Sequence, residues 1–67
     1  MKRIERRLYA AMLTLCDDEG KVLASRGDIV SRAGYNADGG GITYAFEALE
    51  SHNKVTKLGD NLWKIYM

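Results

Sequence analysis

The chain of 67 residues contains no proline, one cysteine and one histidine, and these scarcities remove several classes of protein. A single cysteine, Cys16, has no partner for a disulfide within the chain. With His52 as the only histidine, no cluster of cysteine and histidine has the spacing that zinc sites use. We therefore expect neither a disulfide scaffold nor a metal site, and we expect no cofactor.

Long apolar runs are also missing. The sequence is 46% hydrophobic, but its apolar residues are dispersed and never form the roughly 18-residue run that a membrane helix requires. The charged residues at positions 5–7 interrupt any apolar signal region after Lys2 and Arg3. We expect a protein of the cytoplasm that has no membrane partner.

Neither sign of charge is in clear excess. Ten basic and nine acidic residues give a net charge of +1, which is too small to indicate nucleic-acid binding by itself. Four of the ten basic residues lie among the first seven residues, and three more lie in the last fourteen. A function that depends on charge must therefore depend on where folding places these side chains.

The length of the chain predicts a single domain over residues 1–67, near the lower limit of what one hydrophobic core stabilises. The sequence offers no pairing of histidine with carboxylate, or of nucleophile with base, at a spacing typical of catalysis. We therefore expect that the protein is not an enzyme.

Apolar residues recur at helical spacing from Arg3 to Cys16 and predict a first helix. Gly20 is expected to end this helix in the left-handed cap conformation. The next residues, 21–23, are too few for a helix and predict a short edge strand. The predicted buried stripe of the helix comprises Ile4, Leu8, Ala11, Met12 and Leu15.

A second helix is predicted after Ser25, which is a good N-cap. Asp28 stands three residues later and is placed to complete a capping box with Ser25. Ile29, Val30 and Ala33 form the predicted buried side. Gly34 is expected to end the helix, because a left-handed residue lets the chain turn sharply.

A third helix must start within the turn-forming residues 36–41, with Asp38 as the preferred cap and Asn36 as the alternative. The glycines at 39–41 are either a loop or a place where a partner approaches the backbone closely. Helical spacing places Ile42, Ala45, Phe46 and Leu49 in the core, and places Thr43, Tyr44, Glu47, Glu50 and Ser51 outside.

The last part of the chain alternates as a β-hairpin does. Residues 55–58 predict one strand, residues 59–61 a turn, and residues 62–67 a second strand. Trp63 is expected to cover the small core.

The order of these elements resembles the winged helix-turn-helix superfamily over nearly the whole chain. SRGDIVSRAGY at residues 25–35 is similar to the second helix and turn of many bacterial and phage repressors. AFEALESHNKVTKL at residues 45–58 is similar to a recognition helix that runs into a basic wing. The resemblance implies an α+β fold, a small winged helix-turn-helix with three helices, a C-terminal β-hairpin wing and a short edge strand.

The resemblance also implies sequence-specific binding of double-stranded DNA by a small transcriptional repressor, regulator or accessory factor of phage or mobile-element type, acting as a homodimer. Helix 39–52 would read the major groove, and the wing at 54–67 would follow the DNA backbone. The residues that it assigns to DNA binding are Ser25, Arg26, Gly40, Thr43, Tyr44, Glu47, Lys54, Lys57, Asn61 and Lys64.

Two acidic residues on the third helix favour an alternative function. Glu47 and Glu50 repel phosphate, and only one of them is placed to read a cytosine. The alternative is a winged-helix module that binds a protein, such as an adaptor or inhibitor of a host protein, with little binding to DNA.

Overall fold

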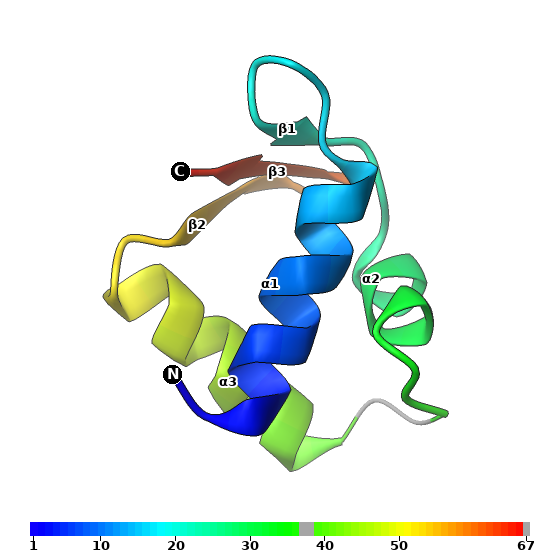
Figure 1. Ribbon diagram of the computed structural model, residues 1–67, viewed down its shortest axis with the longest axis vertical. Coiled ribbons are helices and arrows are strands. Elements are labelled where there is room, and N and C mark those ends of the chain that lie inside the picture. Colours follow the sequence, from blue (N-terminus) through cyan, green and yellow to red (C-terminus); the bar gives the residue numbers. More distant parts are fainter. Residues whose placement is uncertain (37–38, 67) are drawn as a thin grey trace.

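Three helices and a three-stranded antiparallel sheet make up a small α+β domain (Figure 1). The computed structural model describes residues 1–36 and 39–66. In Figure 1 the sheet lies above α2 and α3. The elements in chain order are α1 (Arg3–Leu15), β1 (Lys21–Val22), α2 (Arg26–Arg32), α3 (Gly40–Ser51), β2 (Val55–Gly59) and β3 (Leu62–Ile65).

The sheet has the strand order β1-β3-β2, so the last strand in the sequence is the central one. Trp63 of β3 lies opposite Val22 of β1 and Lys57 of β2. The predicted edge strand and the predicted hairpin are thereby confirmed. The second strand of the hairpin ends at Ile65, before its predicted end, and Met67 lies outside the described residues.

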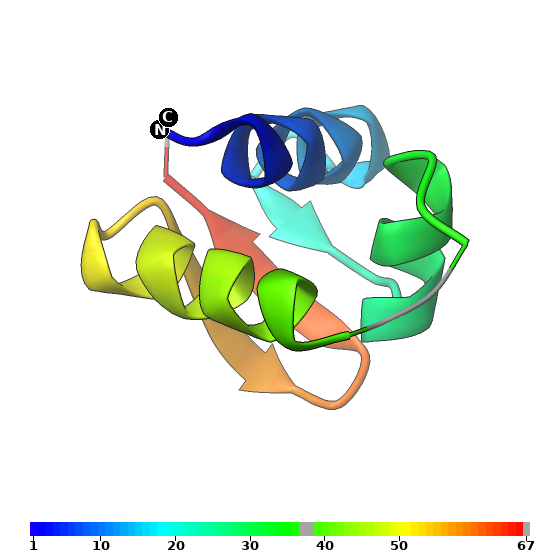
Figure 2. The same ribbon diagram turned by 90° about the horizontal axis from the view of Figure 1, so that it is seen from below.

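A single apolar core joins the helices to the sheet. Each helix contributes the side predicted from its spacing, although Ile4, Leu15 and Ala33 are only partly buried at its edge. Figure 2 shows α1 on one side of α3, with β2 and the turn of its hairpin on the other side. The largest side chains that are fully enclosed are Leu8, Met12, Val22, Ile29, Leu49, Val55 and Ile65.

The end of the first helix differs from the prediction. α1 ends at Leu15, and Cys16 is extended and forms a bridge with Val22. Gly20 does have a positive φ of 80°, but it lies in the turn between α1 and β1 and does not cap the helix. Pairing with β1 ends the helix early, and this contact between separate segments is invisible to helical spacing.

Asp17 holds that turn together. Its Oδ1 atom accepts hydrogen bonds from the backbone N–H groups of Glu19 and Lys21, each at 2.9 Å. The bond from Lys21 is the largest cause that lowers the pKa of the Asp17 carboxyl below its ordinary value. Bonds of this kind favour the charged form of a carboxylate.

Acid is therefore expected to weaken the turn between α1 and β1. A lowered pKa in the folded state means that ionised Asp17 stabilises the fold at neutral pH, and that this contribution is lost as the pH falls below about 4. The Glu19 and Lys21 amide signals in NMR spectra should shift together over that range. Asp17→Asn keeps an acceptor oxygen but cannot ionise, so the shift should vanish. If the Glu19 and Lys21 amide signals of the wild type do not shift as the pH falls below about 4, this role of Asp17 is contradicted.

The capping box and the turn around α2 are confirmed. The Asp28 N–H donates to the Ser25 Oγ at 3.1 Å, and the Ser25 N–H donates to the Asp28 Oδ2 at 3.4 Å. After the last helical residues, Gly34 has a φ of 92°, in the left-handed region that glycine adopts without strain.

The start of α3 differs from the prediction. Gly39 is the N-cap residue, without a capping side chain, so the assignment of Asn36 to that place is wrong. Asp38 lies outside the described residues. Gly40 and Gly41 are helical, which excludes the loop interpretation for these two residues. The predicted inner side of α3 is confirmed, since Ile42, Ala45, Phe46 and Leu49 are all buried.

Candidate nucleic-acid interface

The exposed surface of α3 has two sides. Gly41, Tyr44 and Ala48 follow one another at spacings of three and four residues, and they line a cavity shared with α1. Thr43, at the other side, contacts the start of α2. The structure therefore separates two of the predicted base readers, Thr43 and Tyr44.

The first turn of α3 presents backbone without side chains. A Cβ atom added at Gly39 or Gly40 would meet no other atom within 4 Å. One added at Gly41 would lie 3.7 Å from the Cδ1 of Ile4 in α1, in ordinary contact. The surface at Gly40 is therefore open to the close approach of a partner.

Arg26 and Thr43 join α2 to α3. The Nη2 of Arg26 donates a hydrogen bond of 2.6 Å to the Thr43 hydroxyl, which itself donates to the Gly39 carbonyl at 3.4 Å. The guanidinium also lies over the Phe46 ring, 5.2 Å from its centre. Arg26 and Thr43, both predicted to contact DNA, thus use part of their hydrogen-bonding groups within the protein. The Ser25 hydroxyl is likewise used, as the acceptor in the capping box.

Trp63 connects the wing to the same region. Its ring stacks on Phe46 with centres 5.1 Å apart, and its Nε1 donates to the Ala24 carbonyl at 3.0 Å. The ring is buried, as predicted, and the Nζ of Lys57 lies 5.7 Å from its centre. The exposed Lys57 therefore lies over a ring that is itself fixed to the segment before α2.

The remaining residues of the predicted wing divide into two groups. Lys54, directly after α3, and Asn61, in the hairpin turn, are exposed. Lys64 points to the other face of the sheet from Trp63, because neighbouring residues of a strand alternate. Its Nζ donates to the Glu19 carbonyl in the turn before β1, so Lys64 is not brought together with Lys57.

The charge on α3 itself is negative. Its residues 40–51 include Glu47 and Glu50, both exposed, and no lysine or arginine. Cations of neighbouring segments flank it: Arg26 of α2 contacts Thr43, and Lys2 lines the cavity beside Tyr44. Lys54, directly after α3, and Lys57 of β2 are exposed.

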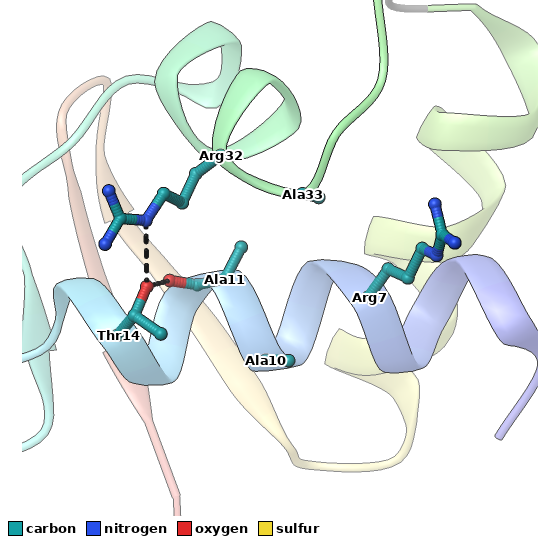
Figure 3. Close-up of a pocket in the computed structure, with 6 residues that line it drawn as sticks. All are labelled: Arg7, Ala10, Ala11, Thr14, Arg32 and Ala33. Carbon is teal, nitrogen blue, oxygen red and sulfur yellow. Dashed lines mark hydrogen bonds between the residues drawn. The ribbon is translucent and has the colours of Figure 1, made fainter.

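A second region of positive charge lies away from α3, between α1 and α2. There a shallow cavity of about 250 Å³ is lined by Arg7, Ala10, Ala11, Thr14, Arg32 and Ala33. Figure 3 shows the two arginines at opposite ends of the row of alanines. The Arg32 Nε donates to the Thr14 hydroxyl at 3.3 Å, and Arg7 lies 5.7 Å from the centre of the Tyr35 ring. These contacts tie the arginines to the fold.

The prediction from sequence did not single out Glu5, which is buried at the cavity between α1 and α3. A signal was present, because Glu5 precedes the buried Met12 by seven residues, and residues at that spacing share one side of a helix. An acidic residue in the first helical turn is usually explained by the helix dipole alone.

Two further features bear on the kind of site. Within residues 1–36 and 39–66, no group of three or more histidine, cysteine, aspartate or glutamate side chains is arranged to hold a metal ion. None of the helices in the described part of the chain combines the length and the apolar character needed to cross a membrane.

A function for this chain has to be inferred from the geometry described above, because the comparisons with known proteins found no match among family models, curated proteins or solved structures.

Proposed function

We propose that the chain is a sequence-specific binder of double-stranded DNA that acts as a small transcription regulator. The observation that carries the proposal is the arrangement of α3 between the start of α2 and the β2–β3 hairpin. The element order and the β1-β3-β2 sheet are compatible with a winged-helix layout. In that layout the third helix enters the major groove and the hairpin follows the phosphates.

The first turn of α3 is the part that suits a groove. At Gly39 and Gly40 no side chain holds a partner away from the backbone. The N–H groups at a helix start point outward and favour phosphate oxygens. Thr43 and Glu47 lie farther along the helix, one turn apart, and would face the base edges. We assign the Thr43 hydroxyl, held by Arg26, as the main reader.

The wing supplies the charge that α3 lacks. Lys57 is exposed and steadied by the Trp63 ring, and Lys54 and Asn61 are exposed nearby in the chain. We assign these three side chains to the DNA backbone. Lys64 is left out of the proposed contact surface because its amino group is engaged with the turn before β1.

The small net charge bears on the oligomeric state. At +1, a single copy gains little from attraction to phosphate. Two copies on neighbouring half-sites would multiply the affinity, since the second contact becomes intramolecular once the first has formed. We therefore propose that the protein binds DNA as a homodimer.

DNA binding is expected to depend on salt and on Lys57. We would select duplexes from a random pool at low salt and then titrate the best one by fluorescence anisotropy. Lys57→Ala should weaken binding to all duplexes and reduce the slope of log affinity against log salt by about one. Thr43→Ala should change which sequences are preferred. Lys21→Ala is the matched control, because Lys21 lies on the far strand and pairs with Glu19. Undetectable or salt-independent binding would contradict the proposal.

The acidic side of α3 favours a second candidate, a module that binds a protein. Glu47 and Glu50 are exposed there without a cation on the same helix. The same titration separates the candidates through Glu47→Lys, which adds a cation to the proposed groove-facing side. Tighter binding to every duplex would support contact of this side with DNA. An unchanged affinity for DNA would place Glu47 outside the DNA interface and favour the second candidate.

A further inference from the structure

Glu5 is the one charged side chain in the core of the described residues. Only 6% of its surface is exposed, and it lines the cavity of about 380 Å³ between the start of α1 and α3. We name this space the α1–α3 cavity. It is lined by Lys2, Ile4, Glu5, Gly41, Tyr44, Ala45, Ala48 and His52.

The Glu5 carboxylate has no counterpart within the described part of the chain. It forms no hydrogen bond and no ion pair with residues 1–36 or 39–66, although Lys2 and His52 line the same cavity. The Glu5 oxygens are not among the fully enclosed polar atoms that lack a partner, so they reach the solvent of the cavity although most of the side chain is buried. A carboxylate in such partly desolvated surroundings gains from pairing with a cation. The folded protein thus keeps an acidic group ready for a ligand of opposite charge.

The position of Glu5 in α1 explains its charge only in part. An acidic residue in the first turn of a helix is stabilised by the positive end of the helix dipole. That effect acts equally on an exposed side chain, so it does not require burial against α3. The placement of Glu5 at a cavity with an apolar wall needs a different reason.

We propose that the α1–α3 cavity binds the side chain of an arginine from a protein partner. The aliphatic stem of arginine would contact Ile4, Ala45 and Ala48, and its guanidinium would meet the Glu5 carboxylate. A guanidinium matches a carboxylate with two parallel hydrogen bonds, which a lysine does not provide.

Tyr44 indicates that the arginine belongs to a protein. Its side chain is 73% exposed at the edge of the cavity. Tyrosine and arginine are the residues that most often dominate the binding energy of protein interfaces. An exposed tyrosine beside a pocket for arginine is therefore suited to a peptide or protein surface. The inference does not rest on DNA binding, because Glu5 lies outside the surface assigned to DNA.

The experiment uses two probes of nearly the same shape. n-Butylguanidinium reproduces the end of an arginine side chain, and N-butylurea is its neutral counterpart. Each is titrated into ¹⁵N-labelled protein at constant ionic strength, and the amide signals of Glu5, Gly41 and Ala48 are followed. We expect saturable shifts with butylguanidinium at an affinity at least about tenfold above that of butylurea, as a bond to a charged group provides. Equal binding of both probes, or no saturable shift, would overturn the proposal.

Two variants test the site itself. Glu5→Gln should remove the preference for the charged probe while both probes still fit the apolar wall. Ala48→Leu keeps Glu5 but fills the cavity from α3, and should abolish binding of both probes. It also serves as the test if Glu5→Gln fails to fold. Unchanged binding of butylguanidinium by a folded form of either variant would overturn the assignment.

A third comparison tests the source of the guanidinium. The blocked peptide acetyl-Gly-Arg-Gly-amide should bind at least as tightly as butylguanidinium and shift the Tyr44 signal, because its backbone would reach the exposed ring. The matched peptide with citrulline in place of arginine should bind at least about tenfold more weakly. If butylguanidinium binds but the arginine peptide does not, the proposal that the guanidinium belongs to a protein is overturned.

Discussion

Trp63→Ala is expected to leave much of the protein unfolded at 25 °C. Trp63 is 2% exposed, stacks on Phe46, and donates a hydrogen bond to the Ala24 carbonyl. Removal of a buried tryptophan costs about 3–5 kcal/mol. A core of this size supplies about the same amount, because a chain shorter than roughly 70–80 residues rarely stores more than 3–5 kcal/mol of stability.

Urea unfolding followed by far-ultraviolet circular dichroism measures this effect without relying on the lost fluorophore. Trp63→Phe is the graded comparison, since it keeps a ring against Phe46 but leaves the Ala24 carbonyl without its donor. It should cost less than the alanine variant. Leu23→Ala is the control, because Leu23 is 80% exposed and its loss should change stability by no more than about 0.5 kcal/mol. A Trp63→Ala midpoint close to that of Leu23→Ala would show that the tryptophan does not hold the core.

Gly20→Ala is expected to be the most damaging exchange of a small residue. Gly20 has a φ of 80°, and an added Cβ would lie 2.7 Å from the backbone oxygen of Ile65. The left-handed conformation alone costs an alanine about 1–2 kcal/mol. The clash is with backbone, and Ile65 cannot move away without losing the 2.7 Å hydrogen bond from its N–H to the Gly20 carbonyl. We expect a total loss of about 2 kcal/mol or more.

Gly40→Ala provides the matched control, because an added Cβ there meets nothing within 4 Å. Alanine in a helix restricts the unfolded chain and favours the helix, so this variant should be as stable as the wild type or more stable by up to about 1 kcal/mol. Thermal unfolding is a sensitive measure, since 1 kcal/mol shifts the midpoint by about 4–8 °C in a domain of this size. Equal midpoints for Gly20→Ala and the wild type would contradict the account of the turn.

Local signals explain most of what the sequence predicted correctly. The capping box of Ser25 and Asp28, the left-handed Gly34 and the inner side of α3 all depend on residues within one or two turns of each other. Two of the wrong boundaries, the end of α1 and the start of α3, carry no such local signal. α1 ends early because Cys16 bridges to Val22, and α3 begins at a glycine that carries no capping group.

The candidate site was predictable in outline but not in its contacts. The sequence placed Thr43 and Arg26 on separate helices as independent DNA contacts, whereas in the fold they are hydrogen-bonded to each other. Lys64 was grouped with Lys57 by position in the hairpin, although strand alternation and the Glu19 carbonyl direct it elsewhere. The burial of Glu5 depends on how α1 packs against α3. Single-sequence patterns carry no direct measure of such packing.

The order of strands in the sheet has a consequence for synthesis on the ribosome. Within the sheet β1 pairs with β3, so this pairing of Lys21 and Val22 must wait for Lys64 and Trp63 to be made. Trp63 also completes the core against Phe46. Contacts between residues so distant in sequence slow folding. The nascent helices therefore leave the exit tunnel without a sheet to cover them, and the domain can complete its fold only after β3 has emerged.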